Sequence, residues 1–331
     1  MLLLAGLLGM AAIGSVMLVG ITEGDETGAA EDVRDLGEEQ DDEQDDRMTD
    51  LASGNLLNDL VTGTDGNDTL SGDDDPTSIS GGDGSDAIDG QGGDDTLAGD
   101  AGEDWVWAGD GDDMVEGGED DDTLHGEAGD DTLHGDEGDD ELFGHIGNDL
   151  SLGGDGDDVI TDGTGADTLH GGDGDDALLG GNDSDTLEGG AGADTLFGGQ
   201  GDDVLDGSEA GEDPDYLNGN DGDDTILADD GDVITGGAGA DDIYLRADPD
   251  QDITLIDFES GEDQLLVVVD DPSGGVEINL TPDESDPDLL HMAVDGEVVA
   301  LLRGANDISL SDISLVSESE AANFEVLPPA A

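Results

Sequence analysis

Aliphatic residues in the middle of this chain recur once every nine positions. Between residues 153 and 206 the sequence divides, without a gap, into GGDGDDVIT, DGTGADTLH, GGDGDDALL, GGNDSDTLE, GGAGADTLF and GGQGDDVLD. Glycine opens nearly every unit, aspartate stands at the sixth place, and Leu, Ile or Val stands at the eighth. A fixed period of this length is typical of a parallel β-helix that stacks one repeated unit. The pattern therefore predicts an all-β fold, a parallel β-roll.

The repeats extend from Gly63 to Tyr244 as about twenty units, and the register is unbroken as far as Asp206. The sixth place is always aspartate except at Thr77, and the eighth is always aliphatic except at Ser151. The glycine of the fourth place is replaced in four units by an aspartate, a residue that tolerates positive φ, so we expect these turns to survive: Asp75, Asp120, Asp183 and Asp213. An insertion near residues 207–209 and a deletion near residues 231–232 predict local irregularity.

In each unit we expect six residues of turn followed by a three-residue strand. Two units then complete one coil, about ten coils in all, and the strands stack at roughly 4.8 Å. Side chains at the seventh and ninth places point outward, and the eighth points inward. The predicted inner layer contains Leu70, Ile88, Leu97, Leu124, Leu133, Ile160, Leu169, Leu178, Leu187, Leu196 and Leu205.

Beyond Tyr244 the nine-residue period stops. Strand-like runs occur at residues 253–258, 264–269, 276–280, 289–294 and 297–302, separated by Gly, Pro, Asp and Ser. Asp295 and Gly296 lie between the last two runs and favour a two-residue hairpin turn, which needs positive φ at both places. We therefore predict an antiparallel β cap over residues 245–317 that closes the end of the roll. Residues 318–331 are expected to form a loose tail.

The chain begins with an uncharged run from Leu2 to Ile21, which is long enough to span a hydrocarbon core. Residues 1–22 therefore predict an N-terminal apolar helix that is either a membrane anchor or a cleaved signal, with a buried helix as the weaker reading. Residues 23–62 are dominated by Asp, Glu and Gln and predict an acidic disordered linker. Within it, the apolar spacing of residues 51–61 fits either a short helix over the first coil or plain linker.

The composition excludes several classes of partner. The 331 residues contain 93 acids and four arginines, with no lysine, for a formal charge of -89. Such a charge repels nucleic acid and anionic lipid, and it destabilises any compact state through self-repulsion. Cations must therefore belong to the folded state. Cysteine is absent, so neither a disulfide framework nor a thiolate metal site can stabilise the chain.

The oxygen atoms of the turns indicate which cation the folded chain needs. Their carbonyl oxygens and the sixth-place carboxylates recur along the same edges of the roll, an arrangement that is repulsive without a metal. Ca²⁺ binds six to eight carboxylate and carbonyl oxygens at roughly 2.3 to 2.6 Å, whereas Mg²⁺ retains its water and demands a tighter octahedron. The sequence therefore predicts several Ca²⁺ ions between stacked turns.

The repeats of residues 63–244 resemble those of the RTX (repeats-in-toxin) family, the hemolysin-type calcium-binding repeats. The following IDFESGEDQLLV resembles the segment that ends the β-roll in serralysin-type C-terminal domains. The resemblance implies a roll that folds only with Ca²⁺, often after export, with the sixth-place aspartate and loop carbonyls as ligands. An N-terminal apolar run is unusual in channel-exported members of the family. Asp215 and Asp232 lie in disturbed units and are weaker candidates. The implied ligands are Asp68, Asp86, Asp95, Asp104, Asp113, Asp122, Asp131, Asp140, Asp149, Asp158, Asp167, Asp176, Asp185, Asp194, Asp203, Asp224 and Asp241.

No catalytic motif accompanies the repeats. The sequence has no HExxH helix motif and no G-x-S-x-G nucleophile elbow. His134 and His170 are expected two coils apart, roughly 10 Å, too far to share a metal, so the histidines are interpreted as outward-facing and solvated. Trp105 and Trp107 should both point outward from one strand, either as a contact site or beneath the N-terminal segment.

These observations predict a calcium-binding protein that is not an enzyme and is extracellular or at the cell surface, with possible anchoring through residues 2–21. We expect a structural or adhesive element that folds on Ca²⁺ and binds no nucleic acid; a cell-surface or matrix partner would be of unknown identity. The alternative is a secretion, targeting or stabilising module that serves a separate enzyme. An enzyme in its own right would need a catalytic cap, for which the sequence gives no sign.

Overall fold

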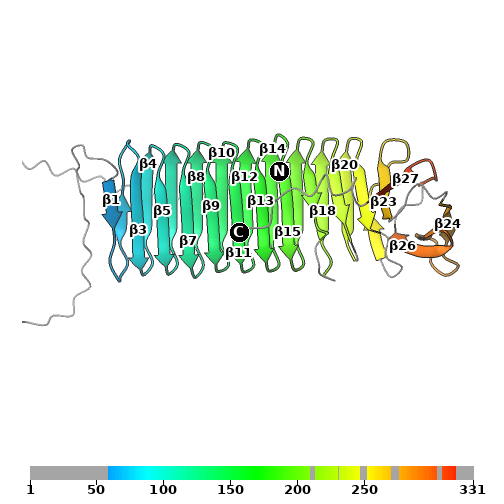
Figure 1. The fold of residues 1–331 in the computed structure, drawn as a ribbon, viewed down its shortest axis with the longest axis horizontal. Helices are drawn as coiled ribbons and strands as arrows, with labels where there is room; N and C mark the ends of the chain where they lie inside the picture. The colour runs from blue at the N-terminus through cyan, green and yellow to red at the C-terminus, as the bar shows by residue number, and fades with distance from the viewer. Residues whose placement is uncertain are drawn as a thin grey trace, which may run out of the picture. The chain divides into compact units, whose positions relative to one another are not determined.

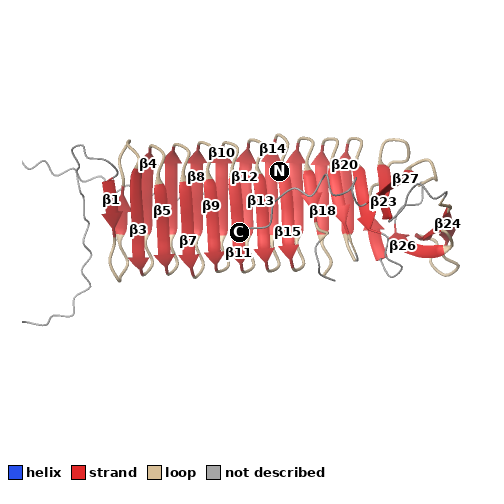
Figure 2. Ribbon diagram, viewed as in Figure 1, coloured by secondary structure: helices blue, strands red, loops and turns tan. Residues whose placement is uncertain are grey.

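The computed structural model describes residues 59–208, 213–229, 231–246, 252–269, 276–303 and 308–317. The expected helix of residues 1–22, most of the acidic linker and the tail of residues 318–331 lie outside these ranges. Within the described residues, no helix is long and apolar enough to cross a membrane. The described part consists of strands and connecting turns (Figure 2).

Two long sheets face each other, and the chain alternates between them strand by strand (Figure 1). The first sheet has 13 strands: β1 (Asp59–Thr62), β3 (Thr77–Asp83), β5 (Thr96–Ala101), β7 (Met114–Glu119), β9 (Thr132–Glu137), β11 (Leu150–Asp155), β13 (Thr168–Asp173), β15 (Thr186–Ala191), β17 (Val204–Asp206), β19 (Thr225–Ala228), β21 (Asp242–Arg246), β23 (Gln264–Val269) and β27 (Ile313–Ser317).

The second sheet has 14 strands, of which the last three stand in the order β26, β25, β24. They are β2 (Thr69–Ser71), β4 (Ala87–Gly92), β6 (Trp105–Asp110), β8 (Thr123–Ala128), β10 (Glu141–Ile146), β12 (Val159–Thr164), β14 (Ala177–Asn182), β16 (Thr195–Gln200), β18 (Tyr216–Asp221), β20 (Val233–Ala238), β22 (Asp252–Leu255), β24 (Ile278–Pro282), β25 (Leu289–Val294) and β26 (Glu297–Arg303). The result is a parallel β-roll of about eleven coils.

Within the repeats, each strand pairs in parallel with the strand two repeats further along the chain. Leu169 stands beside Leu187, and Thr168 beside Thr186, so equivalent places stack on one another. The eighth-place side chains point between the sheets and form one continuous core, as the alternation predicts. Every residue of the predicted inner layer is buried, with at most 2% of its surface exposed. The core is thin because each repeat contributes a single large aliphatic side chain to it.

The strands are longer than expected. In the regular repeats they run for six residues, from the seventh place of one unit through the third place of the next, as in β13, TLHGGD. The expected three-residue strand with a six-residue turn is therefore wrong. The backbone of the first three places keeps the parallel register, with Gly172 beside Gly190, and only the next three places turn. Positive φ at the second place, 124° at Gly172, bends the strand without ending its pairing.

The parallel roll also extends further at both ends. At the start, Asp59–Thr62 forms β1 and pairs with β3, so the last residues of the expected linker belong to the first coil and do not form a helix. At the other end, β22 and β23 continue the parallel sheets, and β27 pairs in parallel with β23. The expectation that all strands after Tyr244 form an antiparallel cap is wrong. Among the described strands, the antiparallel pairs are β24 with β25 and β25 with β26, and β26 itself also pairs in parallel with β22.

The prediction that aspartate can replace the turn glycine at positive φ is confirmed at two positions and not at Asp75, which does not have positive φ. Asp120 and Asp183 adopt φ of 76° and 75° in place of glycine, and the Asp295–Gly296 hairpin has φ of 54° and 86°. The insertion and deletion near the end of the repeats shorten β17 and β19 relative to the six-residue strands. The stacking continues across both irregularities because the changes in length fall between strands.

Candidate calcium sites

The sixth-place aspartates form two ladders, one along each edge of the roll. In each step, the backbone N–H of one aspartate donates to Oδ1 of the equivalent aspartate one coil further on. In the middle of one ladder Asp140 N–H donates to Asp158 Oδ1 at 2.8 Å, and Asp158 N–H donates to Asp176 Oδ1 at 2.8 Å. The backbone therefore fixes each carboxylate through one oxygen, and the second oxygen is left to face the turn.

That second oxygen, Oδ2, is buried and has no hydrogen-bond partner among the described residues at nearly every expected ligand. A buried carboxylate oxygen without a partner is costly, and native proteins pair such atoms or coordinate them to metals. The arrangement holds for Asp86, Asp95, Asp104, Asp113, Asp122, Asp131, Asp140, Asp149, Asp158, Asp167, Asp176, Asp185, Asp194, Asp203, Asp224 and Asp241.

First-place glycines complete an oxygen-lined cradle around these atoms. A Cβ added to Gly153 would lie 2.5 Å from the carbonyl oxygen of Gly171 and closer still to Oδ2 of Asp158. Gly135 has the same surroundings, formed by Asp140 and the carbonyl oxygen of Gly153. The space beside these two glycines is thus bordered by a carboxylate oxygen of the same repeat and a carbonyl oxygen of the next coil. Both are ligand types that Ca²⁺ prefers, so the residues present fit the metal.

Burial raises the pKa of these carboxyl groups, and the repulsion between neighbouring aspartates adds to the effect. The pKa rises to about 8 at Asp122 and Asp185 and to about 7 at Asp131 and Asp158, although each Oδ1 accepts a backbone hydrogen bond that opposes the shift. A proton and a metal ion are alternative ways to neutralise a buried carboxylate. The electrostatics of the turns therefore demand a positive charge at each site.

The ends of the ladders differ from their middle. Asp68, an expected ligand, is only half-buried, and its Oδ2 accepts hydrogen bonds from the backbone N–H and the hydroxyl of Thr64 at 2.6 and 2.9 Å. Asp232 is buried, but its Oδ2 accepts from the backbone N–H of Asp229 at 2.8 Å. Asp215 is buried and continues the ladder between Asp194 and Asp232. At Asp68 and Asp232, a backbone N–H of the same turn therefore donates to Oδ2, the oxygen that has no hydrogen-bond partner at the other expected ligands.

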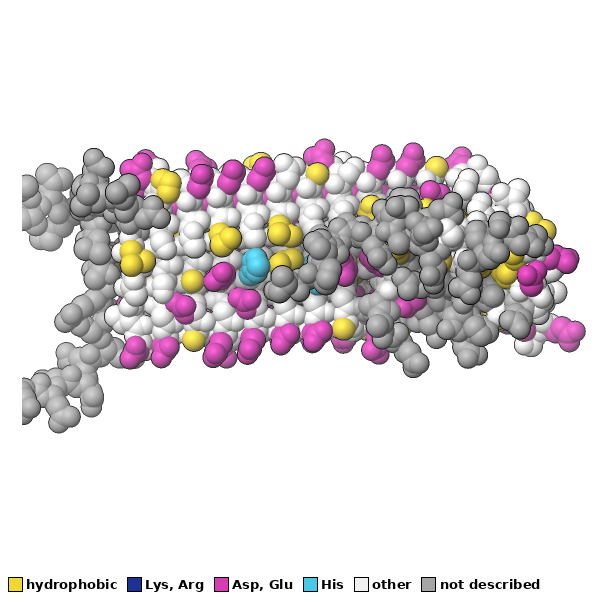
Figure 3. All heavy atoms as spheres, in the orientation of Figure 1, with side chains coloured by type: hydrophobic (Ala, Val, Ile, Leu, Met, Phe, Trp, Pro, Cys, Tyr) yellow, Lys and Arg dark blue, Asp and Glu magenta, His cyan; other side chains and the backbone are white. Residues whose placement is uncertain are grey.

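Three features of the sites are not predicted by the sequence pattern. Asp263 extends one ladder beyond the repeats by accepting the N–H of Asp241 at 3.2 Å. Along the roll, aspartates at the fifth place form an exposed ladder of their own, for example Asp175 N–H to Asp157 Oδ1 at 2.9 Å. Acidic side chains accordingly line both long edges of the face shown in Figure 3. The frequent aspartate at the fifth place is the signal that could have revealed this ladder.

The third feature is a polar pair inside the aliphatic core. Ser151 replaces the eighth-place aliphatic of β11, and Asp162 replaces the first-place glycine of β12 on the opposite sheet. The Ser151 hydroxyl donates to Asp162 Oδ1 at 2.8 Å, and both residues are fully buried. Burial holds the pKa of Asp162 well above its ordinary value. Ser151 and Asp162, which both depart from the repeat pattern, therefore supply each other's hydrogen-bond partner across the core.

The histidines are less isolated than the sequence suggests. His134 and His170 lie two strands apart in the first sheet, on β9 and β13, as expected. His125, in contrast, is half-buried and stacks between Trp107 and Phe143, and its Nδ1 lies 3.0 Å from Nε2 of His145. Burial and His145 lower the pKa of His125. The interpretation of every histidine as solvated is therefore wrong for His125.

The fold and the sites define a class of protein, the calcium-binding β-rolls. The family model for the RTX calcium-binding nonapeptide repeat (4 copies) matches residues 53–75, 80–115, 90–124, 116–150, 152–187, 179–210, 209–232 and 229–252. These matches cover more than half of the chain, and the chain belongs to this family. RTX nonapeptide repeats are Ca²⁺-binding motifs, and this roll is a structural calcium-binding fold.

Two solved structures are similar over parts of the chain. The AlgE6R3 subunit from the Azotobacter vinelandii mannuronan C5-epimerase is 20% identical, with 52% of this chain and 86% of that chain covered and a TM-score of 0.26. The extracellular lipase LipA from Serratia marcescens is 17% identical, with 67% of this chain and 45% of that chain covered and a TM-score of 0.20. No curated protein matches the chain.

Proposed function

We propose that this protein is a calcium-dependent structural element that acts at or beyond the cell surface. The observation that carries the proposal is the row of buried, orphaned Oδ2 atoms along each edge of the roll. Uncompensated carboxylates at that density would oppose folding, because each must be desolvated and each repels its neighbours. A chain built in this way is unstable without cations and rigid with them.

In this proposal the sixth-place aspartates with orphaned Oδ2 atoms hold Ca²⁺ together with carbonyl oxygens of the adjacent turns. The metal supplies the positive charge that the turns lack and joins each coil to the next. Asp68 and Asp232 are assigned a lesser role because N–H groups of their own turns occupy Oδ2. Calcium then replaces the disulfides that the chain cannot form, since it contains no cysteine.

A general property of calcium modules supports a location outside the cytoplasm, and one surface feature of this chain supports an adhesive role. Extracellular calcium modules are tuned to roughly 10⁻⁴ to 10⁻³ M Ca²⁺, a range in which a chain of this kind folds only after export. On the surface, Trp105 is 55% exposed and its ring centroid lies 5.9 Å from that of Trp107, so two aromatic side chains on one strand offer a contact site. Residues 2–21 would serve as the anchor or the cleaved signal.

Circular dichroism of the metal-free chain tests the folding claim. We expect a disordered spectrum after removal of divalent ions and a strand spectrum in millimolar Ca²⁺, with several ions bound per chain by calorimetry. Strand signal that persists at pH 8 without divalent ions, where the turn aspartates are not neutralised by protons, would refute calcium-dependent folding. Protease treatment of intact cells tests location, because protected repeats would contradict surface display. If a separate enzyme lost its activity when this chain was deleted, the chain would be a module serving that enzyme.

A further inference from the structure

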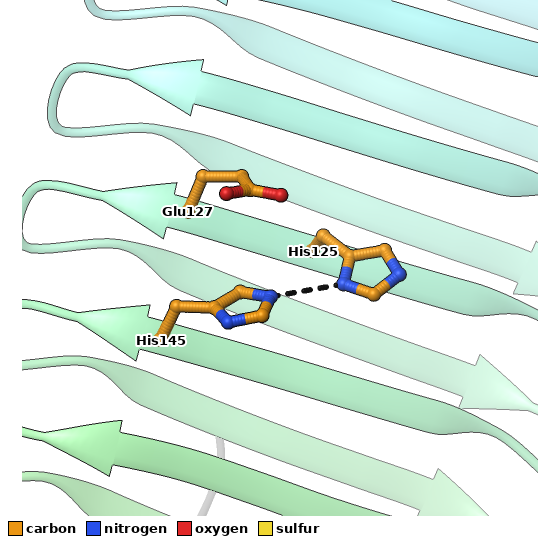
Figure 4. Close-up of side chains that lie close together, drawn as sticks. All are labelled: His125, Glu127 and His145. Atoms are coloured by element: carbon orange, nitrogen blue, oxygen red, sulfur yellow. Dashed lines mark hydrogen bonds between the residues drawn. The ribbon is translucent and has the colours of Figure 1, made fainter. Parts of the chain in front are cut away.

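Three side chains on the outer face of the second sheet bring metal-binding atoms together (Figure 4). His125 and Glu127 project from β8, and His145 projects from the adjacent strand β10. One ligand atom from each residue lies within 4.8 Å of the other two. Glu127 is directly opposite His145 in the parallel pair, and His125 is diagonal to it, so the backbone register itself assembles the cluster.

We propose that His125, Glu127 and His145 form a binding site for a divalent transition metal, with Zn²⁺ as the best fit, separate from the calcium ladders. Imidazole nitrogen suits Zn²⁺, whereas Ca²⁺ is bound almost entirely by oxygen. The chain thus has two kinds of metal site, distinguished by their donor atoms.

The spacing of the two imidazoles supports this site. Two nitrogens bound at about 2.0 to 2.1 Å in a tetrahedral site lie roughly 3.3 Å apart. His125 Nδ1 and His145 Nε2 are already 3.0 Å apart. Binding requires that both of these nitrogens be bare, so the hydrogen that one of them carries in the His–His hydrogen bond moves to the other nitrogen of its ring. The Glu127 carboxylate becomes the third ligand through a small rotation of its side chain.

The surroundings hold His125 in place and leave Glu127 exposed to solvent. His125 lies between Trp107 and Phe143, with centroid distances of 5.8 and 4.7 Å and interplanar angles of 2° and 11°, which fixes the plane of its ring. Glu127 is exposed, and on its other side, opposite Gly109 of the neighbouring strand β6, it borders an open recess of ≈ 400 Å³ that neither histidine lines, so its carboxylate is not packed against other side chains. With three protein ligands, a coordination position remains open to water or to an external donor.

The backbone conformation of Glu127 and His145 allows each ligand to be replaced by glycine without strain. Glu127 and His145 both occupy the second place of a repeat, and both have φ of 74°, a conformation that most repeats give to glycine. Glycine at either position therefore removes a ligand and relieves backbone strain at the same time. Asp136 occupies the same place on the opposite sheet, with φ of 75°, so Asp136→Gly is a matched control that also removes one acid.

The test titrates the full chain, saturated with millimolar Ca²⁺, with Zn²⁺ by calorimetry and with Co²⁺ by visible absorption, while tryptophan emission reports binding near Trp107. We expect one Zn²⁺ per chain, quenching by Co²⁺ that Zn²⁺ reverses, and an affinity about 10-fold or more weaker in His145→Gly. Glu127→Gly should weaken binding in the same direction, and Asp136→Gly should match the wild type.

Equal Zn²⁺ affinity in the wild type, His145→Gly and Asp136→Gly would overturn the proposal, because the metal would then bind the general acidic surface. If no Zn²⁺ binding were detected in the Ca²⁺-saturated wild type, the proposal would also be overturned, and His125 and His145 would be a hydrogen-bonded pair without a metal. The strand spectrum in Ca²⁺ verifies that each variant is folded. A failure of calcium-dependent folding would be a separate result, because the circular dichroism spectrum is measured before any Zn²⁺ is added.

Discussion

Replacing Gly153 with alanine tests the calcium cradle at the centre of the roll. The φ of Gly153 lies outside the left-handed region, so alanine suits its backbone and the only change is the added methyl group. That Cβ would lie 2.5 Å from the Gly171 carbonyl oxygen and closer to Oδ2 of Asp158, whereas real Cβ atoms essentially never approach within 3.0 Å. The methyl group therefore occupies the space that we assign to the metal.

The size of the effect follows from the contacts that must change. To accommodate the methyl group, the Asp158 carboxylate has to rotate away from the hydrogen bond that it accepts from Asp140 at 2.8 Å. Overpacking a tight site costs about 1 to 3 kcal/mol, and losing a hydrogen bond to a charged group costs about 1.5 to 3 kcal/mol. We expect the calcium-bound roll to lose about 2.5 to 6 kcal/mol of unfolding free energy in total. The affected calcium site should weaken at least about 100-fold.

The assay compares urea unfolding in saturating Ca²⁺ and the Ca²⁺ midpoint of the strand signal. Gly92→Ala is the matched control, since its added Cβ would stand 3.4 Å from the Asp110 carbonyl oxygen, an ordinary contact, and its φ is likewise outside the left-handed region. Gly92→Ala should behave like the wild type. Indistinguishable Ca²⁺ midpoints and stabilities for the two alanine variants would refute the cradle as a metal site.

Three further perturbations have defined outcomes. Asp158→Asn keeps an acceptor for the backbone N–H but turns the orphaned oxygen into a donor, so calorimetry should show weaker Ca²⁺ binding; unchanged affinity would remove Asp158 from the ligand set. Because burial raises the pKa of Asp122 and Asp185 to about 8 in the folded chain, and the same groups titrate at their ordinary 3.8 when unfolded, protonation favours the folded metal-free roll. The stabilisation that these two protonated groups contribute is complete below about pH 4 and is lost as the pH rises toward 8. The strand signal of the metal-free chain should therefore be stronger at pH 5 than at pH 8. An equal signal at the two pH values would contradict the raised pKa values. Ser151→Leu alone should destabilise the calcium-bound roll by about 1 to 3 kcal/mol, because it leaves the Asp162 carboxyl without the serine hydroxyl. The double change with Asp162→Gly restores the repeat and should recover that loss or more in urea unfolding; no recovery would show that the pair is not coupled.

Much of the roll could be predicted because its contacts recur at a fixed offset. Leu169 is buried and stacked on Leu187 simply because both stand at the eighth place of units one coil apart. The same periodicity could have placed His145 beside His125, two residues more than one coil away in sequence. The prediction failed there because the second place of the repeat was assigned to a turn, whereas the structure continues the strand through it. Because parallel pairing continues through the second place, His145 stands opposite Glu127 and diagonal to His125.

The sequence by itself determined the period, the inward-facing aliphatic row and the concentration of oxygen ligands at the turns. It could do so because each repeat contacts only its neighbours, so a local pattern dictates the whole stack. Only the tertiary structure decided which carboxylate oxygens are orphaned, that Ser151 and Asp162 meet across the core, and that parallel pairing continues into β22, β23 and β27. Those features depend on burial and on contacts between the two sheets, which a one-dimensional pattern does not contain.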